Sequence, residues 1–161
     1  TWNNEDGTLL ETDAEVPYGA TPSYDGATPE KAATAEFTYT FSGWSPAVSA
    51  VTGDVVYTAQ YTAVTNTYAV TFVDYDGTEL VTDRVSYGGA ATPPADPERE
   101  GYTFTGWDTS FDSVIASITV TATYEINTYT VTFEDFDGTV LGTDTVNWNT
   151  AATAPADRMR W

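Results

Sequence analysis

An internal repeat constrains the fold of this chain more than any other feature. Residues 67–78, TYAVTFVDYDGT, return as TYTVTFEDFDGT at 128–139, which is 61 positions later when Gly77 is compared with Gly138. A shorter version, TWNNEDGT, occupies residues 1–8. Self-similarity at a fixed period marks supersecondary units arranged in tandem. We therefore expect an array of small units rather than one domain of 161 residues.

A second set of landmarks shows how far each copy extends. Gly43-Trp44 and Gly106-Trp107 both precede a tyrosine by 17 residues, at Tyr61 and Tyr124. We predict a first unit without the Tyr-x-Val of its opening strand, a complete second unit, and the first half of a truncated third unit. These three segments span residues 1–64, 65–126 and 127–161, and we expect the chain to be a fragment of a longer protein.

The first copy is longer than the second in two places. Residues 23–35, rich in Ala, Thr and Pro, indicate a longer loop or a short helix, and two extra residues fall at 63–65. We expect both insertions to lie in connections, because connections tolerate changes of length better than strands do.

Each unit is expected to contain four strands. In the second copy, apolar and polar residues alternate over 68–75, 79–87, 102–108 and 118–125, the period-2 pattern of half-buried strands. Residues 88–101 contain three prolines, so they are expected to form a crossover with at most a short helical turn. No segment has a 3.6-residue apolar period, and the predicted fold class is mainly β.

One Asp-Gly step occurs near the start of every copy. Gly7, Gly77 and Gly138 follow an aspartate, and this dipeptide supplies the positive φ angles of a tight type I′ hairpin turn. We therefore interpret these glycines as structural turn residues that join the first two strands.

The order of these motifs resembles the Listeria–Bacteroides repeat, the family that includes the B-repeat of listerial internalins. The resemblance covers nearly the whole chain, although the first copy lacks its opening Tyr-x-Val and the third lacks its last two strands. In the second copy it rests on Tyr68, Val70, Phe72, Asp76, Gly77, Thr78, Val85, Tyr87, Gly88, Pro97, Gly101, Tyr102, Phe104, Gly106, Trp107 and Tyr124. In the first copy it rests on Trp2, Asp6, Gly7, Thr8, Val16, Tyr18, Gly19, Phe41, Gly43, Trp44 and Tyr61.

The resemblance implies an α+β, ubiquitin-like β-grasp unit with little helix, repeated along a secreted or wall-anchored bacterial surface protein. It implies a spacer or accessory adhesion module, located outside the cell, and not an enzyme. A ligand-binding module that recognises a host glycan or protein, through strand edges or the 23–35 loop, is the alternative.

Composition excludes several other classes of function. The chain has no His and no Cys, so it has no imidazole base, thiol nucleophile or zinc thiolate. Its net charge of −19 argues against a nucleic-acid partner, since phosphate recognition needs clustered basic side chains. No apolar run is long enough to insert into a membrane, and we expect no cofactor.

Two kinds of residue are candidates for sites. The aspartates of the Asp-x-Asp-Gly turns, Asp74, Asp76, Asp135 and Asp137, are weak calcium candidates, because they do not have the spacing of an EF-hand loop. Trp44 and Trp107 could stack on sugars, but a fixed place after glycine on a strand favours a core anchor. Trp148 stands where Tyr18 and Tyr87 stand and is expected to pack as they do.

The half-unit 127–161 raises the question of what covers its hairpin. Val131, Phe133, Val140 and Val146 should form an exposed apolar face. A two-stranded hairpin is marginal alone, so we expect order to come from packing on the second unit, on another chain, or by strand exchange. Residues 158–161 are native or an artefact; the sequence leaves both open.

Overall fold

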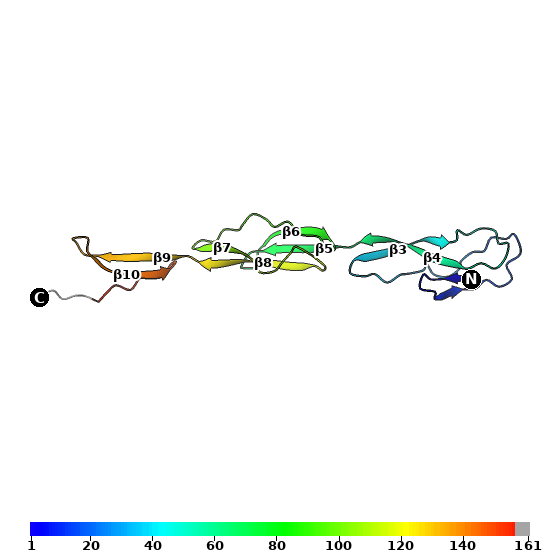
Figure 1. Ribbon diagram of the computed structural model, residues 1–161, viewed down its shortest axis with the longest axis horizontal. Helices are drawn as coiled ribbons and strands as arrows, with labels where there is room; N and C mark the ends of the chain where they lie inside the picture. Colours follow the sequence, from blue (N-terminus) through cyan, green and yellow to red (C-terminus); the bar gives the residue numbers. More distant parts are fainter. Residues whose placement is uncertain (157–161) are drawn as a thin grey trace. The chain divides into compact units, whose positions relative to one another are not determined.

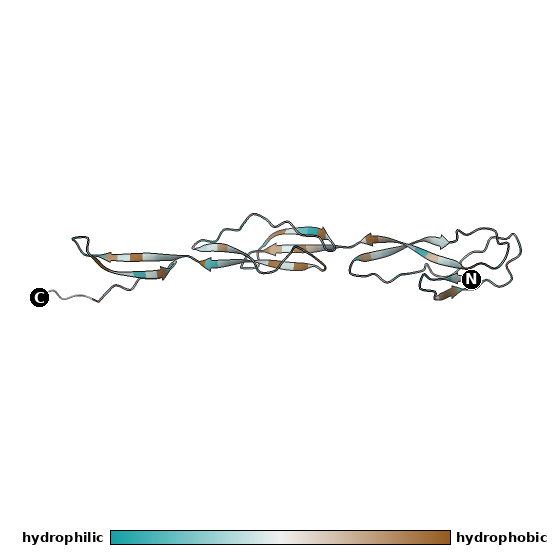
Figure 2. Ribbon diagram, viewed as in Figure 1, coloured by the Kyte–Doolittle hydropathy of each residue, from teal (hydrophilic) through white to brown (hydrophobic). Residues whose placement is uncertain are grey.

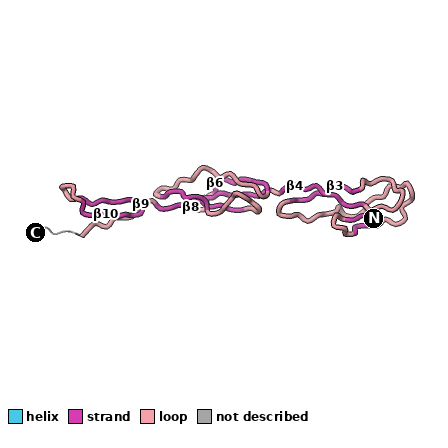
Figure 3. The backbone as a smooth tube through the Cα atoms, viewed as in Figure 1, coloured by secondary structure: helices cyan, strands magenta, loops and turns pink. Residues whose placement is uncertain are grey.

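The computed structural model describes residues 1–156, and within them it contains strands and loops but no helix (Figures 1 and 3). The predicted mainly-β class is confirmed. The chain divides into two compact units, Thr1–Tyr68 and Ala69–Trp161, so the third copy groups with the second. The question raised for residues 158–161 lies outside the described residues.

The first unit is a four-stranded mixed sheet. Its strands are β1 (Trp2–Asn3), β2 (Leu9–Glu11), β3 (Phe37–Ser45) and β4 (Tyr57–Thr65), in the order β2-β1-β4-β3. β1 is antiparallel to β2 and parallel to β4, while β3 and β4 are antiparallel. The parallel pair at the centre of the sheet requires a long crossover from β2 to β3.

The second unit repeats this topology. It contains β5 (Thr67–Val73), β6 (Glu79–Ser86), β7 (Tyr102–Trp107) and β8 (Ile118–Ile126), in the order β6-β5-β8-β7. Its remaining strands, β9 (Thr128–Glu134) and β10 (Val140–Asn147), form a separate antiparallel hairpin.

The crossover between β6 and β7 is extended rather than helical. Gly88 donates its amide to the carbonyl of Val114, and Val114 donates to that of Gly89, at 2.7 and 2.9 Å. In the first unit Gly19 and Val51 form the corresponding bond at 2.8 Å. Prolines at 93, 94 and 97 remove amide donors from this segment, so an extended path bonded to the neighbouring loop is favoured over a helix.

The Asp-Gly turns differ from the type I′ turns expected from sequence. Gly77 has φ +86°, but Asp76 is not among the non-glycine residues with positive φ, whereas type I′ requires both. The amide of Gly77 bonds to the carbonyl of Asp74 at 2.9 Å, and the amide of Asp74 bonds to that of Thr78 at 2.8 Å. The turn is therefore type I followed by a left-handed glycine, the usual three-residue hairpin loop.

The extra residues at 63–65 lie inside a strand, so our expectation that they fall in a connection is wrong. The β3–β4 ladder runs from Phe41↔Tyr61 to Phe37↔Thr65, whereas the β7–β8 ladder runs only from Phe104↔Tyr124 to Tyr102↔Ile126. Beyond the Phe–Tyr pair, both strands of the first hairpin thus extend two residues further than those of the second. Two is the side-chain period of a strand, so the facing of every side chain is preserved.

The Phe-x-Gly-Trp motif is a β-bulge. The β7–β8 register shifts between Phe104 and Gly106, and Gly106 has φ +128°, a conformation that L side chains rarely adopt. Residues three apart on a regular strand face opposite sides, but the bulge brings Phe104 and Trp107 together at 5.4 Å between ring centroids. Phe41 and Trp44 pair in the same way at 5.3 Å.

The core lies between each sheet and its crossover. Val70, Phe72 and Val120 are completely buried in the second unit, and Trp2, Tyr57 and Ala59 fill the equivalent place in the first. The alternation of hydrophobic and hydrophilic residues along the strands is visible in Figure 2. It follows that one face of each sheet is apolar while threonines occupy the other.

Candidate functional site

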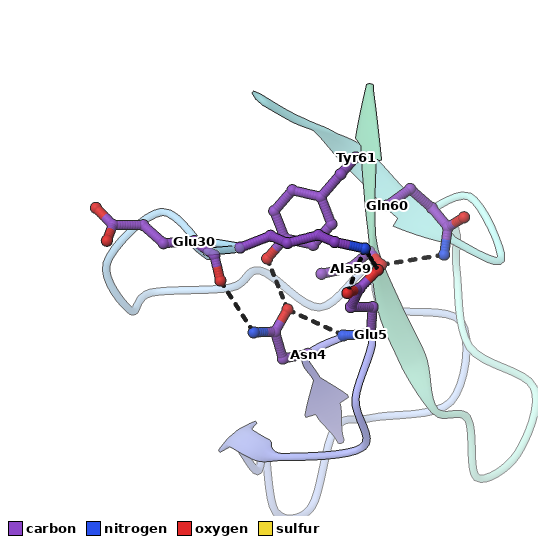
Figure 4. Close-up of polar contacts among 7 residues, drawn as sticks. Asn4, Glu5, Glu30, Ala59, Gln60 and Tyr61 are labelled. Atoms are coloured by element: carbon purple, nitrogen blue, oxygen red, sulfur yellow. Dashed lines mark hydrogen bonds and ion pairs between the residues drawn. The ribbon is translucent and has the colours of Figure 1, made fainter. Parts of the chain in front are cut away.

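The first turn of each complete unit is tied to the last strand by a tyrosine. The hydroxyl of Tyr124 donates to Asp74 Oδ1 at 2.6 Å, and that of Tyr61 donates to Asn4 Oδ1 at 2.6 Å (Figure 4). Burial, reinforced by the hydrogen bond to Asp74, raises the pKa of Tyr124 to about 12. The sequence marked both tyrosines as landmarks of the repeat but gave no indication of these partners.

The remaining turn aspartates bond within their own turns. Asp76 Oδ1 accepts the Thr78 amide at 2.9 Å, and Asp137 Oδ1 accepts the Thr139 amide at 3.0 Å. The bond from the Thr78 amide holds the pKa of Asp76 below its usual value. Asp74 and Asp135 each accept the amide of the following residue. The calcium hypothesis for Asp74, Asp76, Asp135 and Asp137 stays a prediction, and residues 1–156 contain no group of three or more acidic side chains placed to hold a metal.

Trp44 and Trp107 lie half-buried in aromatic clusters. Trp44 contacts Trp2 at 4.8 Å, Tyr24 at 4.9 Å and Phe41 at 5.3 Å between ring centroids. Trp107 contacts Phe72 at 5.0 Å. Tyr24 belongs to the insertion 23–35, so this insertion packs against the ring that was considered as a sugar platform.

The insertion is fixed to the unit at several points and contains no helix. Glu11 Oε2 accepts the amides of Asp25 and Gly26 at 2.9 and 3.0 Å, and Asn4 Nδ2 donates to the carbonyl of Glu30 at 3.1 Å (Figure 4). Of the two interpretations offered by the sequence, the longer loop is the one observed.

Each unit places one basic side chain over an equivalent tyrosine. The guanidinium of Arg99 lies 3.7 Å from the ring centroid of Tyr102 and 3.8 Å from that of Tyr75. In the first unit Lys31 Nζ lies 4.3 Å from the Tyr39 centroid and forms an ion pair with Glu5 at 2.6 Å. The hydrogen bond that Lys31 donates to Glu5 raises the pKa of Lys31. Through these contacts the two cations hold the crossover against the sheet. Nothing in the sequence indicated this role.

A single asparagine separates consecutive copies. β4 ends at Thr65 and β5 begins at Thr67, and β8 ends at Ile126 and β9 begins at Thr128. The intervening residues, Asn66 and Asn127, each accept a threonine hydroxyl, from Thr38 at 2.7 Å and from Thr103 at 2.6 Å. Their amides bond to the carbonyls of Glu36 and Gly101 at 2.8 and 2.9 Å. Each junction is therefore held to the unit before it by backbone and side chain alike.

The third copy contacts the second through Trp148. The amide of Trp148 donates to the carbonyl of Asn127 at 2.8 Å, and its ring lies 6.3 Å from that of Tyr102. A side chain on Gly101 would overlap the indole. This contact corresponds to the first of the three routes to order proposed for the half-unit.

One depression on the first unit holds about 450 Å³. Its lining includes the carboxylates of Asp13, Glu15 and Asp54 beside Val55 and Val56. No helix in the described range could cross a lipid bilayer.

Comparison with known proteins gives partial matches. Residues 68–127 match the model of the Listeria–Bacteroides repeat domain. Internalin H of Listeria monocytogenes is 39% identical over 80 residues, covering 43% of this chain and 14% of the internalin. A Gly-rich membrane protein and a second membrane protein of Evansella cellulosilytica are 35% and 28% identical over 83 and 123 residues, covering 45% and 70% of this chain. The chain spans only 10% and 18% of those two relatives.

Among solved structures, domains 3–4 of a streptococcal cell-surface protein with high-identity tandem repeats align with 78% of this chain and 93% of theirs. The TM-score of 0.35 and the identity of 16% are too low to support an argument about fold or function. The family assignment rests instead on the sequence matches and on the repeated Asp-Gly and Gly-Trp landmarks. The complete unit at residues 68–127 of this chain is a Listeria–Bacteroides repeat domain.

Proposed function

We propose that the chain is a spacer in an extracellular, bacterial cell-surface protein, with an accessory part in adhesion and no catalytic activity. The observation that carries the proposal is the one-residue junction, repeated at Asn66 and Asn127. A flexible linker needs several unbonded residues, whereas each junction asparagine forms both a backbone and a side-chain bond to the preceding unit. We infer that such short joints restrict movement between consecutive copies.

The charge of the chain supports the same role. Twenty-four acidic residues are distributed over all copies, and like-charge repulsion between units disfavours folding back and association. The relatives named above are an internalin and membrane proteins, which supports the proposed location at the cell surface. We also propose that the partner in adhesion is a host-surface protein or glycan.

We also propose that each complete unit is of the β-grasp type, with an extended crossover in place of the helix. The support is the mixed sheet in which the first and fourth strands are central and parallel. The carboxylates of the turns and the tryptophans of the bulges have structural partners, which favours a mechanical role over a chemical one.

The junctions can be tested by distance measurements between spin labels. The chain has no cysteine, so T40C and T82C introduce the only two labelling sites. We expect a narrow distance distribution that broadens in N66A, while the matched variant N147A, altered within β10, leaves it unchanged. A wild-type distribution as broad as that of a Gly/Ser linker would contradict the spacer proposal.

The ligand-binding alternative requires a different readout. Binding of the full chain to panels of glycans and host-surface proteins should be unsaturable or absent if the chain is a passive spacer. Saturable binding that is lost when residues 23–35 are deleted, with the sheet intact by circular dichroism, would favour the binding module instead.

A further inference from the structure

The strands at which the chain enters and leaves a complete unit are neighbours in the sheet. In the second unit the chain enters at β5, directly after Asn66, and leaves at the end of β8, directly before Asn127. β5 and β8 are adjacent and parallel at the centre of the sheet (Figure 1). In the first unit β1 is likewise parallel to β4. Tension along the chain therefore acts on two strands that lie side by side.

The direction of this tension determines how the two strands can separate. A pull on the start of β5 and on the end of β8 acts in opposite directions along the strands, because parallel strands run the same way. The other neighbour of β5 is β6, and the other neighbour of β8 is β7. The sheet must therefore divide into the halves β6–β5 and β8–β7, which slide past each other along the β5–β8 contact.

Backbone pairing and apolar packing both resist this sliding. Four register pairs join β5 to β8, and in one of them Phe72 stands opposite Val120, with both side chains completely buried. A pull along the strands stresses all of these pairs together. A pull that separates the strands from one end stresses them one after another, so it should open the contact at a much lower force.

Side-chain hydrogen bonds close the β5–β8 contact at both ends. Before the first register pair, the amide of Ala69 on β5 donates to Ser117 Oγ at 3.2 Å. Beyond the last pair, the hydroxyl of Tyr124 on β8 donates to Asp74 Oδ1 at 2.6 Å. The tyrosine bond that ties the turn to the last strand therefore crosses the contact that tension would shear.

We propose that the central parallel pair of strands is a mechanical clamp, which keeps the unit folded while the chain is under tension. This function goes beyond spacing, because a spacer needs restricted joints whereas a clamp resists extension of the units themselves. The resistance depends on the direction of pull as well as on the free energy of unfolding, because forced unfolding is governed by the rate of unfolding.

Two pairs of attachment sites distinguish the two directions of pull in the full chain. Because the chain has no cysteine, T67C with E125C allows pulling along the strands, and T67C with A116C allows pulling them apart from one end. All three positions are exposed.

Single-molecule force measurements on both double variants test the clamp. At equal loading rate we expect a rupture force about threefold higher for the first pair of sites, because that pull stresses the four register pairs together. Opening of the unit is recognised by a gain of about 20 nm in chain length in that geometry. Equal forces in the two geometries would overturn the proposal. The sites lie within one unit, so the result is independent of the junctions on which the spacer proposal rests.

A variant at the far end of the contact separates the clamp from general stability. Y124F removes the hydroxyl that bonds Asp74, at the end remote from residues 67 and 116. It should lower the rupture force along the strands and leave unchanged the force that starts separation from the other end. The matched control T123V removes a hydroxyl that bonds the Gly106 carbonyl on β7, outside the β5–β8 contact, and should change neither force.

An equal decrease of both forces in Y124F would show that Tyr124 contributes only to overall stability, and it would contradict the clamp. Should Y124F fail to fold, the comparison of the two pulling geometries in the chain with Tyr124 intact decides the question.

Discussion

The indole of Trp148 lies directly against the backbone of Gly101, leaving no space for a side chain on that glycine. Trp148 belongs to the third copy and Gly101 to the second, so the contact joins two copies inside one compact unit. Gly101 has φ +76°, a backbone conformation that favours glycine. The position therefore requires glycine both for its conformation and for its lack of a side chain.

Replacing this glycine should loosen the third copy. G101A is expected to cost at least about 2 kcal/mol, from the positive φ and from overlap with the indole. G138A is the matched control, since Gly138 has φ +84° with open space around it, and should cost about 1 kcal/mol. Chemical denaturation followed by hydrogen exchange at Trp148 measures both, and equal losses would show that the indole contact contributes nothing.

Arg99 should stabilise the second unit through its two aromatic contacts. R99Q is expected to lower the free energy of unfolding by about 1 kcal/mol, the usual size of a partly exposed cation–π contact. R84Q removes the same charge from an exposed position on β6 and controls for the general effect of a more negative chain. An R84Q loss as large as that of R99Q would assign the effect to net charge.

Burial of Tyr124, together with its hydrogen bond to Asp74, predicts a loss of stability in alkali. The folded-state pKa is about 12, above the value of about 10 for an unfolded tyrosine, so the protonated hydroxyl stabilises the fold. This contribution is complete below pH 10 and disappears between about pH 10 and 12. Y124F should flatten the stability profile in this window relative to wild type. Retention of the wild-type slope in Y124F would mean that another group is responsible.

Replacing a bulge glycine should lower stability even though there is space for a larger side chain. G43A is expected to cost about 1–2 kcal/mol because φ +133° suits only glycine, with no atom within 4 Å of the added methyl group. G53A, in the same unit with an equally open site and no positive φ, should be nearly neutral. Thermal unfolding of both variants measures the difference, and a similar shift in each would argue against strain at the bulge.

Strand positions and the fold class followed from the sequence because alternation of apolar and polar residues reports the two faces of a sheet. The Gly-Trp landmark was correctly located, but its meaning as a bulge that turns Phe104 and Trp107 to one face requires the ladder register. The predicted turn type was wrong because Asp-Gly is compatible with two hairpin loops, the type I′ turn and the type I turn followed by a left-handed glycine. Which of the two forms depends on the backbone hydrogen bonds of Asp74. The partners of Arg99 and Asn127 come from distant segments and have no local signal.

The paired insertion in β3 and β4 has a consequence for how such arrays vary in size. Adding two residues to each strand extends the hairpin by about 7 Å, while the apolar face stays where it was. A single added residue would instead expose that face. The strands of such a hairpin can therefore be lengthened only by even numbers of residues if the apolar face is to stay buried. Evolution or design can lengthen a unit in this way and leave its core and junction chemistry unchanged.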